Sequence, residues 1–342
     1  MVDLKAVHSS NSRIAATFPS GLVAVFVGAT SGIGEYTLLE FAKCAPKSRI
    51  YFIGRSAEAG ARIKAEVDKR NPEGSCLFIK SDVSLIKNVD DVCREIKGKE
   101  SSINLLFQSQ GTLDFKAATS EGLKTALALM FYSRIRFMMN LLPEMRTASP
   151  VLARAITVGA GTKEGPITPT DFEMENLSLT KSRGVGATMA TLSLEALQQQ
   201  APEVTFIHAY PGAVKSQIGR TFSGWLLIVN YLMKLLIAIV GVPPKETGER
   251  HVYLATSKRW PAKGSRTGVE LSAWGTTAKG TDGEEGSGVY SVDAKDESAG
   301  PKIVKLLKQY REDGTRDKLW KFVMEKFEKI TGTIPTQASN NQ

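Results

Sequence analysis

The stretch that most constrains the fold of this chain is Gly-Ala-Thr-Ser-Gly-Ile-Gly at 28–34, which directly follows the apolar run 22–27. An uninterrupted apolar run of this length predicts a parallel strand that is buried on both faces. The residues after the stretch are helical in character, so the order is strand, glycine turn and helix. In that order Gly28 permits the tight turn, Gly32 lets the backbone approach a ligand, and Gly34 lets the helix pack on the strand. Free N–H groups at the start of the helix then predict a site for a dinucleotide pyrophosphate.

Apolar segments alternate with helical segments along the first two thirds of the chain. After the first run, strands are expected at 49–53, 76–79, 103–107, 155–158 and 204–208, with a last strand at 287–292. The main helices are expected at 125–142, 186–199 and 303–330, the last as a charged, amphipathic helix or helix pair. Such alternation predicts an α/β domain with a doubly wound, Rossmann-like parallel sheet and right-handed crossovers.

One segment does not fit a surface of such a domain. Residues 224–242 are almost wholly apolar, interrupted only by Asn230 and Lys234. Since a lysine in mid-span costs about 3 kcal/mol, the interpretation favoured here is a lid over an apolar substrate pocket. Peripheral contact with a bilayer and a true membrane span remain as alternatives. The chain is therefore divided into an N-terminal tail (1–20), a dinucleotide-binding core (21–221), an apolar insert (222–262) and a C-terminal extension (263–342).

Composition excludes several classes of function. The three cysteines are scattered and the three histidines have no ligand spacing, so no metal site is expected and a reducing, cytoplasmic location is favoured. The net charge is +9, but basic residues are interspersed with acidic ones, which argues against a nucleic-acid partner. Residues 1–20 are polar and mixed, unlike a signal peptide.

Further motifs follow the later strands at the spacing of one known family. They are Asp82-Val83 after the third strand, Gly111 after the fourth, Leu142-Pro143 at the end of the long helix, and Pro211-Gly212 after the sixth strand. With the glycine turn, they make residues 21–216 resemble the short-chain dehydrogenase/reductase family. This resemblance implies a nicotinamide cofactor that lies across the carboxyl ends of the strands.

The resemblance assigns each motif to one part of the cofactor. It implies that Asp82 holds the adenine amino group, that Val83 packs on the adenine ring and that Gly111 lines the nucleoside side. Pro211, Gly212 and Ser216 are expected at the nicotinamide end. The predicted cofactor-binding residues are Gly28, Thr30, Ser31, Gly32, Ile33, Gly34, Arg55, Asp82, Val83, Gly111, Pro211, Gly212 and Ser216.

The end of the second strand bears on the choice of cofactor. A site for NAD typically has Asp or Glu there to bind the ribose hydroxyls. This chain has Gly54-Arg55 instead, so no carboxylate repels a 2′-phosphate and Arg55 can bind one. The sequence therefore favours NADP over NAD, with an ordinary surface arginine as the alternative.

The family's catalytic residues do not carry over. The family uses a Tyr and a Lys four residues apart, a Ser at the end of the fifth strand and an Asn in the long helix. Here Ala160 stands at the serine position, Met130 at the asparagine position and Ser178 at the tyrosine position. Ser182 stands at the lysine position, with Lys181 one step away. Without these groups, neither the proton nor the oxyanion contact for carbonyl reduction is supplied in the usual way.

Few side chains remain as replacements, and Tyr210, Lys181 and Ser178 are the predicted catalytic residues. Tyr210 directly precedes the motif assigned to the nicotinamide end, and His208 shares its face by strand alternation. A packed core tyrosine and a satisfied core histidine are the alternative interpretation.

The long helix offers two more polar side chains near the asparagine position. Ser133 and Arg134 share a face with Met130, whereas Tyr132 faces away. The charge of Arg134 can instead serve a subunit interface. The family commonly forms dimers through the helices at 125–142 and 186–199, and the sequence does not decide between monomer and homodimer.

These observations predict an NADP(H)-dependent oxidoreductase that acts on a hydrophobic small molecule. The missing catalytic set, the run 176–179, the apolar insert and the C-terminal extension resemble atypical fungal members of the family from secondary-metabolite pathways. Two alternatives stay open. One is a non-redox cyclase or isomerase that orients its substrate on the same scaffold. The other is a cofactor-binding protein without turnover.

Overall fold

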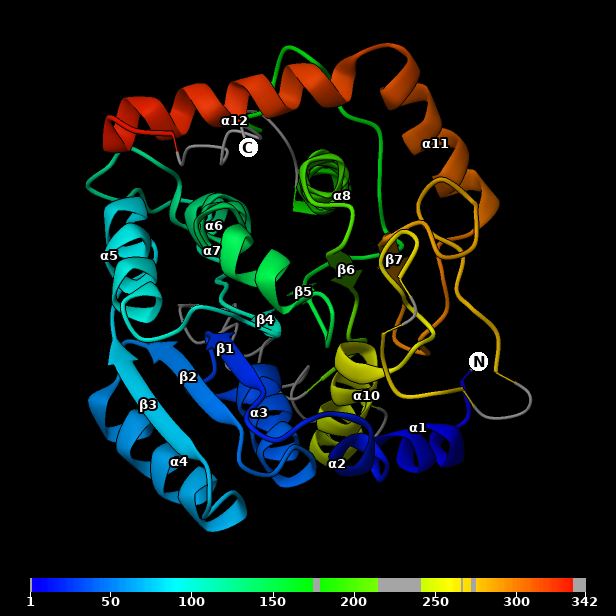
Figure 1. Ribbon diagram of the computed structural model, residues 1–342. Coiled ribbons are helices and arrows are strands. Elements are labelled where there is room, and N and C mark those ends of the chain that lie inside the picture. The colour runs from blue at the N-terminus through cyan, green and yellow to red at the C-terminus, as the bar shows by residue number, and fades with distance from the viewer. Residues whose placement is uncertain (1, 175–178, 215–240, 266, 272–274, 335–342) are drawn as a thin grey trace, which may run out of the picture.

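A parallel sheet of seven strands forms the centre of the molecule, in the order β3-β2-β1-β4-β5-β6-β7. The computed structural model describes residues 2–174, 179–214, 241–265, 267–271 and 275–334 (Figure 1). The strands are β1 Val23–Val27, β2 Arg49–Gly54, β3 Ser75–Lys80, β4 Leu105–Gln108, β5 Arg154–Val158, β6 Thr205–Ala209 and β7 Val289–Val292. The predicted doubly wound parallel sheet is confirmed, and so is the last strand predicted near 287–292.

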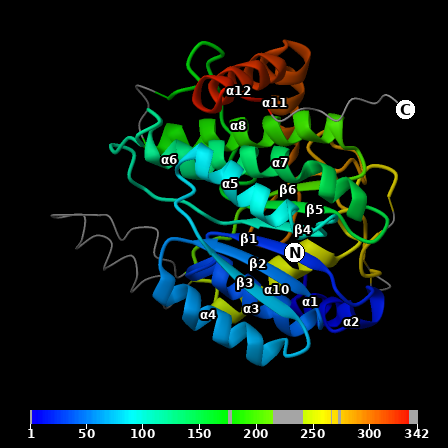
Figure 2. The ribbon, with the colours of Figure 1, turned by 60° about the vertical axis from the view of Figure 1, so that its left-hand side comes forward.

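Helices cover both faces of the sheet (Figures 1 and 2). One face carries α1 Leu4–Asn11, α2 Ile14–Thr17, α3 Gly32–Cys44, α4 Ala57–Arg70 and α10 Pro244–Thr256. The other carries α5 Ile86–Lys97, α6 Thr125–Leu127, the π-helical turn η1 Ala128–Tyr132, α7 Ser133–Ala148 and α8 Leu179–Gln200, with α11 Pro301–Glu312 and α12 Thr315–Thr331 outside them. The fold thus has one α/β sandwich with an extra helical layer on one side.

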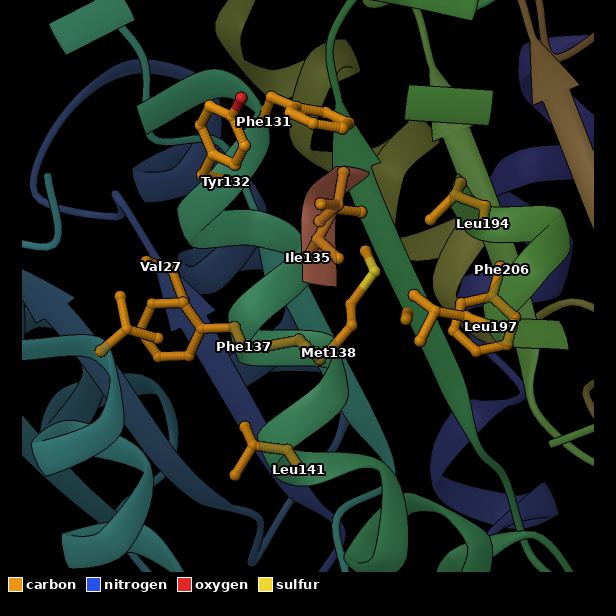
Figure 3. Close-up of a cluster of buried hydrophobic side chains, with 14 of the residues drawn as sticks. Val27, Phe131, Tyr132, Ile135, Phe137, Met138, Leu141, Leu194, Leu197 and Phe206 are labelled. Carbon is orange, nitrogen blue, oxygen red and sulfur yellow. The ribbon is translucent and has the colours of Figure 1, made fainter. Parts of the chain in front are cut away.

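The core is apolar on both faces of the central strand, as its sequence requires. Every residue of β1 is buried, and Phe26 packs against Phe41 of α3 and Phe107 of β4 with ring centroids 5.7 and 5.6 Å apart. On the opposite face, Met138 of α7 points toward Leu197 and Phe206 (Figure 3). Burial on both sides explains why β1 reads as an unbroken apolar run rather than an alternating one.

The described residues on either side of the apolar segment pack against the rest of the domain. Gly248 lets α10 lie directly on α3, because a Cβ at this position would be 2.5 Å from the carbonyl oxygen of Tyr36. Val242 donates its N–H to Ala213 O at 2.8 Å. The apolar segment 224–242 lies outside the described residues except for its last two, so its role as a lid stays a prediction. None of the helices in the described ranges is long and apolar enough to cross a membrane.

The C-terminal helices pack on the core through apolar and charged contacts. α12 runs across α8 and α5 (Figure 1), where Phe327 is fully buried and lies 6.2 Å from the ring of Tyr132. On α11, Arg311 pairs with the buried Glu195 of α8 at 2.7 Å. The predicted amphipathic helix pair is confirmed, and it covers part of α8 with the chain's own residues. Pairing of two subunits through α7 and α8 stays a prediction.

Substitution of Phe327 by Ala tests whether α12 is an integral part of the core. Removing a fully buried aromatic side chain should lower the free energy of unfolding by about 3–5 kcal/mol, because it leaves a cavity. Urea denaturation followed by circular dichroism measures this loss. The control is Lys329→Ala in the same helix, an exposed position where a change within about 0.5 kcal/mol is expected. A loss below about 1 kcal/mol for Phe327→Ala would show that α12 is not packed as described.

Candidate active site

The glycine turn at the end of β1 presses against the end of β4. Gly28 has a φ of +79°, and a Cβ there would lie 2.5 Å from the backbone nitrogen of Gln110. A Cβ on Gly34 would lie 2.5 Å from Ser109 Oγ and 2.7 Å from the carbonyl oxygen of Gly28. A side chain at either position would push the glycine turn away from the end of β4 or from the start of α3. The two glycines therefore have the structural roles that the sequence predicted for them.

Helix α3 begins directly after this turn. Ser31 is the N-cap of α3 in extended conformation, and its hydroxyl makes no capping hydrogen bond. Gly32 follows with a φ of +62°. Thr30 fills the space over Gly54 at the end of β2, where a Cβ would be 2.3 Å from Thr30 Cγ2. A helix N-terminus with unused N–H donors beside a tight turn is a binding site for an anion such as a pyrophosphate.

The ends of β2 and β3 bring the next predicted residues together. Arg55 Nη1 lies 4.0 Å from Asp82 Oδ2, and the two side chains are 52% and 44% exposed. Asp82 also accepts hydrogen bonds from the N–H and hydroxyl of Ser84, while Val83 is buried. Such an exposed ion pair contributes little to stability, so Arg55 is available to a ligand. A cavity of about 560 Å³ opens beside this pair.

His208 lies at the end of β6 in a chain of buried hydrogen bonds. Its Nε2 accepts from Ala160 N–H at 3.0 Å, which leaves Nδ1 protonated to donate to Thr191 Oγ1 at 2.9 Å. The Thr191 hydroxyl then donates to the carboxylate of Glu164 at 2.8 Å. Burial, reinforced by the positive charge of Arg134, lowers the pKa of His208 to about 3. Both ring nitrogens are used, so His208 is a satisfied core histidine and has no free atom for proton transfer.

Tyr210 stands half-buried just beyond β6, between two cations. Lys163 Nζ and Arg183 Cζ lie 5.2 and 5.0 Å from the centre of its ring. Its backbone N–H donates to Val292 O at 2.8 Å, which ties it to β7. The predicted Lys181 is exposed on α8, whereas the two cations at Tyr210, Lys163 and Arg183, are not among the predicted residues. No sequence motif marks these two, because they meet at Tyr210 only through the tertiary fold.

The remaining predicted residues divide between described and undescribed parts of the chain. Pro211 and Gly212 directly follow Tyr210, with a φ of +78° at Gly212. Gly111 lies under Met130, whose Cγ would be 3.3 Å from a Cβ there. Ser178 and Ser216 lie outside the described residues.

Arg134 is buried beneath the ends of β4 and β5. Its Nη1 donates to Thr157 Oγ1 at 2.7 Å and to Val158 O at 2.6 Å, and its Nη2 donates to Gln110 O. Ser133 lies beside it and accepts from Gln110 Nε2 at 3.3 Å. The predicted common face of Ser133 and Arg134 is confirmed, whereas the alternative of a subunit interface is wrong for Arg134. This side chain is 5% exposed and bonded within its own chain.

Comparison with known proteins agrees with this geometry. The sequence model of a family described as short chain dehydrogenase matches residues 22–226. The chain belongs to this family. This short-chain dehydrogenase is 38% identical to Oxidoreductase AN1596 of Emericella nidulans, over 94% of its own length and 96% of the relative. It is 33% identical to Oxidoreductase andH of Emericella variicolor, over 97% and 99% of the two chains.

Solved structures share the fold at low sequence identity. The L-sorbose reductase of Gluconobacter frateurii, solved with NADPH and L-sorbose, superposes with a TM-score of 0.53 at 18% identity. The match covers 76% of this short-chain dehydrogenase and 98% of the reductase. The family and the oxidoreductase relatives identify the chain as an enzyme of the oxidoreductase type.

The buried state of His208 predicts how stability depends on pH. The unfolded chain binds a proton on this residue below its ordinary pKa of 6.5, whereas the folded chain does so only near a pKa of about 3. The free energy of unfolding should therefore fall as the pH falls from about 6 to about 4, with His208 contributing about 1.4 kcal/mol per pH unit. In His208→Gln this contribution is absent, so the slope should be shallower by that amount. Urea denaturation at a series of pH values measures it, and parallel curves for the two proteins would contradict a neutral buried His208.

Proposed function

We propose that this short-chain dehydrogenase is an NADP(H)-dependent oxidoreductase that acts on a hydrophobic small molecule in fungal secondary metabolism. The observation that carries the choice of cofactor is the end of β2. Arg55 stands there, exposed beside Asp82, at the position where a site for NAD typically has Asp or Glu. An arginine here can make charge-assisted hydrogen bonds to a 2′-phosphate. The L-sorbose reductase that shares the fold was solved with NADPH, which agrees with this choice.

The described residues fit a dinucleotide. The open N-terminus of α3 would hold the pyrophosphate against Gly28 and Gly32, and Arg55 would hold the 2′-phosphate. By resemblance, Asp82 and Val83 would hold the adenine. When bound, the nicotinamide exchanges a hydride with a carbon atom of the substrate. The protein's part is to orient the substrate and to supply or accept a proton.

Tyr210 is our candidate for that proton. It is the tyrosine that directly precedes Pro211-Gly212 at the carboxyl edge of the sheet, and Lys163 and Arg183 hold its ring there. Lys181 and Ser178, the other two predicted residues, belong to the same part of the chain as Arg183, and we propose that they assist Tyr210. Ala160 and Met130 cannot serve, because neither side chain carries a proton donor.

The proposed substrate class and cellular location are based on other parts of the chain. Two fungal relatives named as oxidoreductases align over nearly the whole length. We propose the apolar segment 224–242 as a lid or as a contact with a membrane surface. Cys44, Cys76 and Cys93 are all unpaired. Free thiols are typical of a reducing compartment, so we propose a cytoplasmic enzyme.

Substitution of Arg55 by Ala tests the choice of cofactor. We expect the wild-type protein to bind NADPH more tightly than NADH. The variant should lose about 10-fold or more of its NADPH affinity, since a charged hydrogen bond contributes about 1.5–3 kcal/mol. Its NADH affinity should change little, because NADH has no 2′-phosphate. Titration calorimetry measures both.

The control for this experiment is Arg70→Ala, which removes an exposed arginine from the far end of α4. It should leave both affinities unchanged. Equal losses for NADPH and NADH in Arg55→Ala would contradict the phosphate contact, and no binding of either cofactor to the wild-type protein would contradict the oxidoreductase proposal.

Substitution of Tyr210 by Phe tests the proton donor. NADPH consumption with a panel of apolar ketones and enones is followed by absorbance. Loss of a positioned general acid should lower kcat by about 10²-fold or more, while the affinity for NADPH stays the same. Tyr132→Phe, a buried tyrosine on the far side of η1, serves as control and should keep full activity. Full activity in Tyr210→Phe would show that another group supplies the proton.

The missing donors at Ala160 and Met130 also favour a second candidate, a cyclase or isomerase that works by orienting its substrate. Turnover of such a substrate without any change in nicotinamide absorbance would support it over the redox proposal. Cofactor binding without turnover, and a cellular output that survives loss of Tyr210, Lys181 and Ser178, would instead indicate a binding protein.

A further inference from the structure

Arg134 carries a buried positive charge that no carboxylate in the described part of the chain neutralises. Its hydrogen bonds go to four neutral oxygens, namely Leu129 O, Gln110 O, Val158 O and Thr157 Oγ1. Among the residues that the structure describes, no carboxylate lies within ion-pair distance of its guanidinium. Burial lowers its pKa to about 9, so the group remains protonated at neutral pH.

Most other buried arginines in the described ranges have an acidic partner. Arg136, two residues along α7, pairs with Asp90 at 2.6 Å. Arg250 pairs with Asp296 at 2.7 Å. Only Arg154 resembles Arg134, since it is fully buried and donates to the carbonyl oxygens of Leu254 and Ser257. An uncompensated charge inside a protein is costly, so its position calls for a reason.

That position is directly beneath the carboxyl edge of the sheet. A Cβ on Gly111, after β4, would lie 3.8 Å from Arg134 Nη2, and a Cβ on Gly159, after β5, would lie 3.8 Å from Nη1. Arg134 donates a hydrogen bond to the carbonyl oxygen of Gln110, and the backbone of Gln110 packs against Gly28 of the glycine turn. The charge therefore lies beside two glycines at the edge where the cofactor is proposed to bind.

We propose that the buried charge of Arg134 makes this site select the reduced, uncharged nicotinamide over the oxidised, positively charged one. This inference rests on the proposed function. At an effective dielectric constant of about 20, repulsion between like charges is large enough to change the ratio of the two affinities roughly tenfold when their separation is on the order of 10 Å. The site then binds the hydride donor more tightly than the spent form, which is the preference of a reductase. Arg134 is thus a specificity-determining residue.

The test compares three ligands on the full chain by titration calorimetry at low ionic strength. They are NADPH, NADP⁺ and 2′,5′-ADP, which lacks the nicotinamide. The wild-type protein should bind NADPH about tenfold or more tightly than NADP⁺. In Arg134→Met this ratio should fall toward one, because the variant keeps the length of the side chain but loses the charge. Arg134→Lys keeps the charge and should keep most of the ratio.

Arg154→Met is the matched control. It removes a buried arginine that also has no carboxylate partner among the described residues but lies at the opposite end of β5. The ratio of NADPH affinity to NADP⁺ affinity should therefore stay as in the wild type. Similar affinity of all variants for 2′,5′-ADP would show that the binding edge is intact.

Three outcomes overturn the inference: equal binding of NADPH and NADP⁺ by the wild type, an unchanged ratio in an Arg134→Met protein that binds 2′,5′-ADP normally, or an equal loss of the ratio in Arg154→Met. Because the first outcome needs no variant, the test stands even if Arg134→Met does not fold. Absence of binding by all three ligands to the wild type overturns the proposed function instead.

Discussion

The contact between Gly28 and the backbone of Gln110 determines the geometry of the whole ligand edge. It brings the end of β1 against the end of β4, at a distance that no side chain on Gly28 would permit. The direction in which α3 leaves the turn follows from it, since Gly34 packs over the same turn. Arg134 stabilises this contact, because its guanidinium donates hydrogen bonds both to the carbonyl oxygen of Gln110 and to that of Val158 at the end of β5. One glycine and one arginine thus align three strand ends, and the anion site at α3 depends on that alignment.

Much of this arrangement could be predicted because it is encoded locally. A buried strand, a glycine turn and a helix follow one another in the sequence, and each motif assigned to the cofactor directly follows a strand. In a parallel sheet the carboxyl ends of the strands meet at one edge, so Arg55 and Asp82 had to come close once the strand order was known. The last strand was found for the same reason, because its apolar run is bounded by turn residues.

What could not be predicted depends on contacts between distant elements. Helical spacing placed Arg134 on the correct face of α7, but its charge also fitted an interface, and only packing shows that it is buried. The cations at Tyr210 come from a loop after β5 and from α8, which no sequence pattern connects. The family's lysine position indicates Lys181 instead. Tertiary contacts of this kind leave no periodic or motif signal in a single sequence.

Arginines lie at both ends of the sheet, and the partners of each one bear on its role. At the amino edge Arg49 of β2 forms a close ion pair with the buried Glu100, whereas the buried Arg154 of β5 donates to the carbonyl oxygens of Leu254 and Ser257. At the carboxyl edge the acceptors of Arg134 among the described residues are all neutral, and its charge disfavours a second proton on His208. Stability alone would favour a paired or an apolar residue at this place, because breaking or omitting a buried pair leaves an expensive charge. Retaining the charge beneath this edge is understandable if it acts on the ligand as we propose, by disfavouring the positively charged form of the nicotinamide.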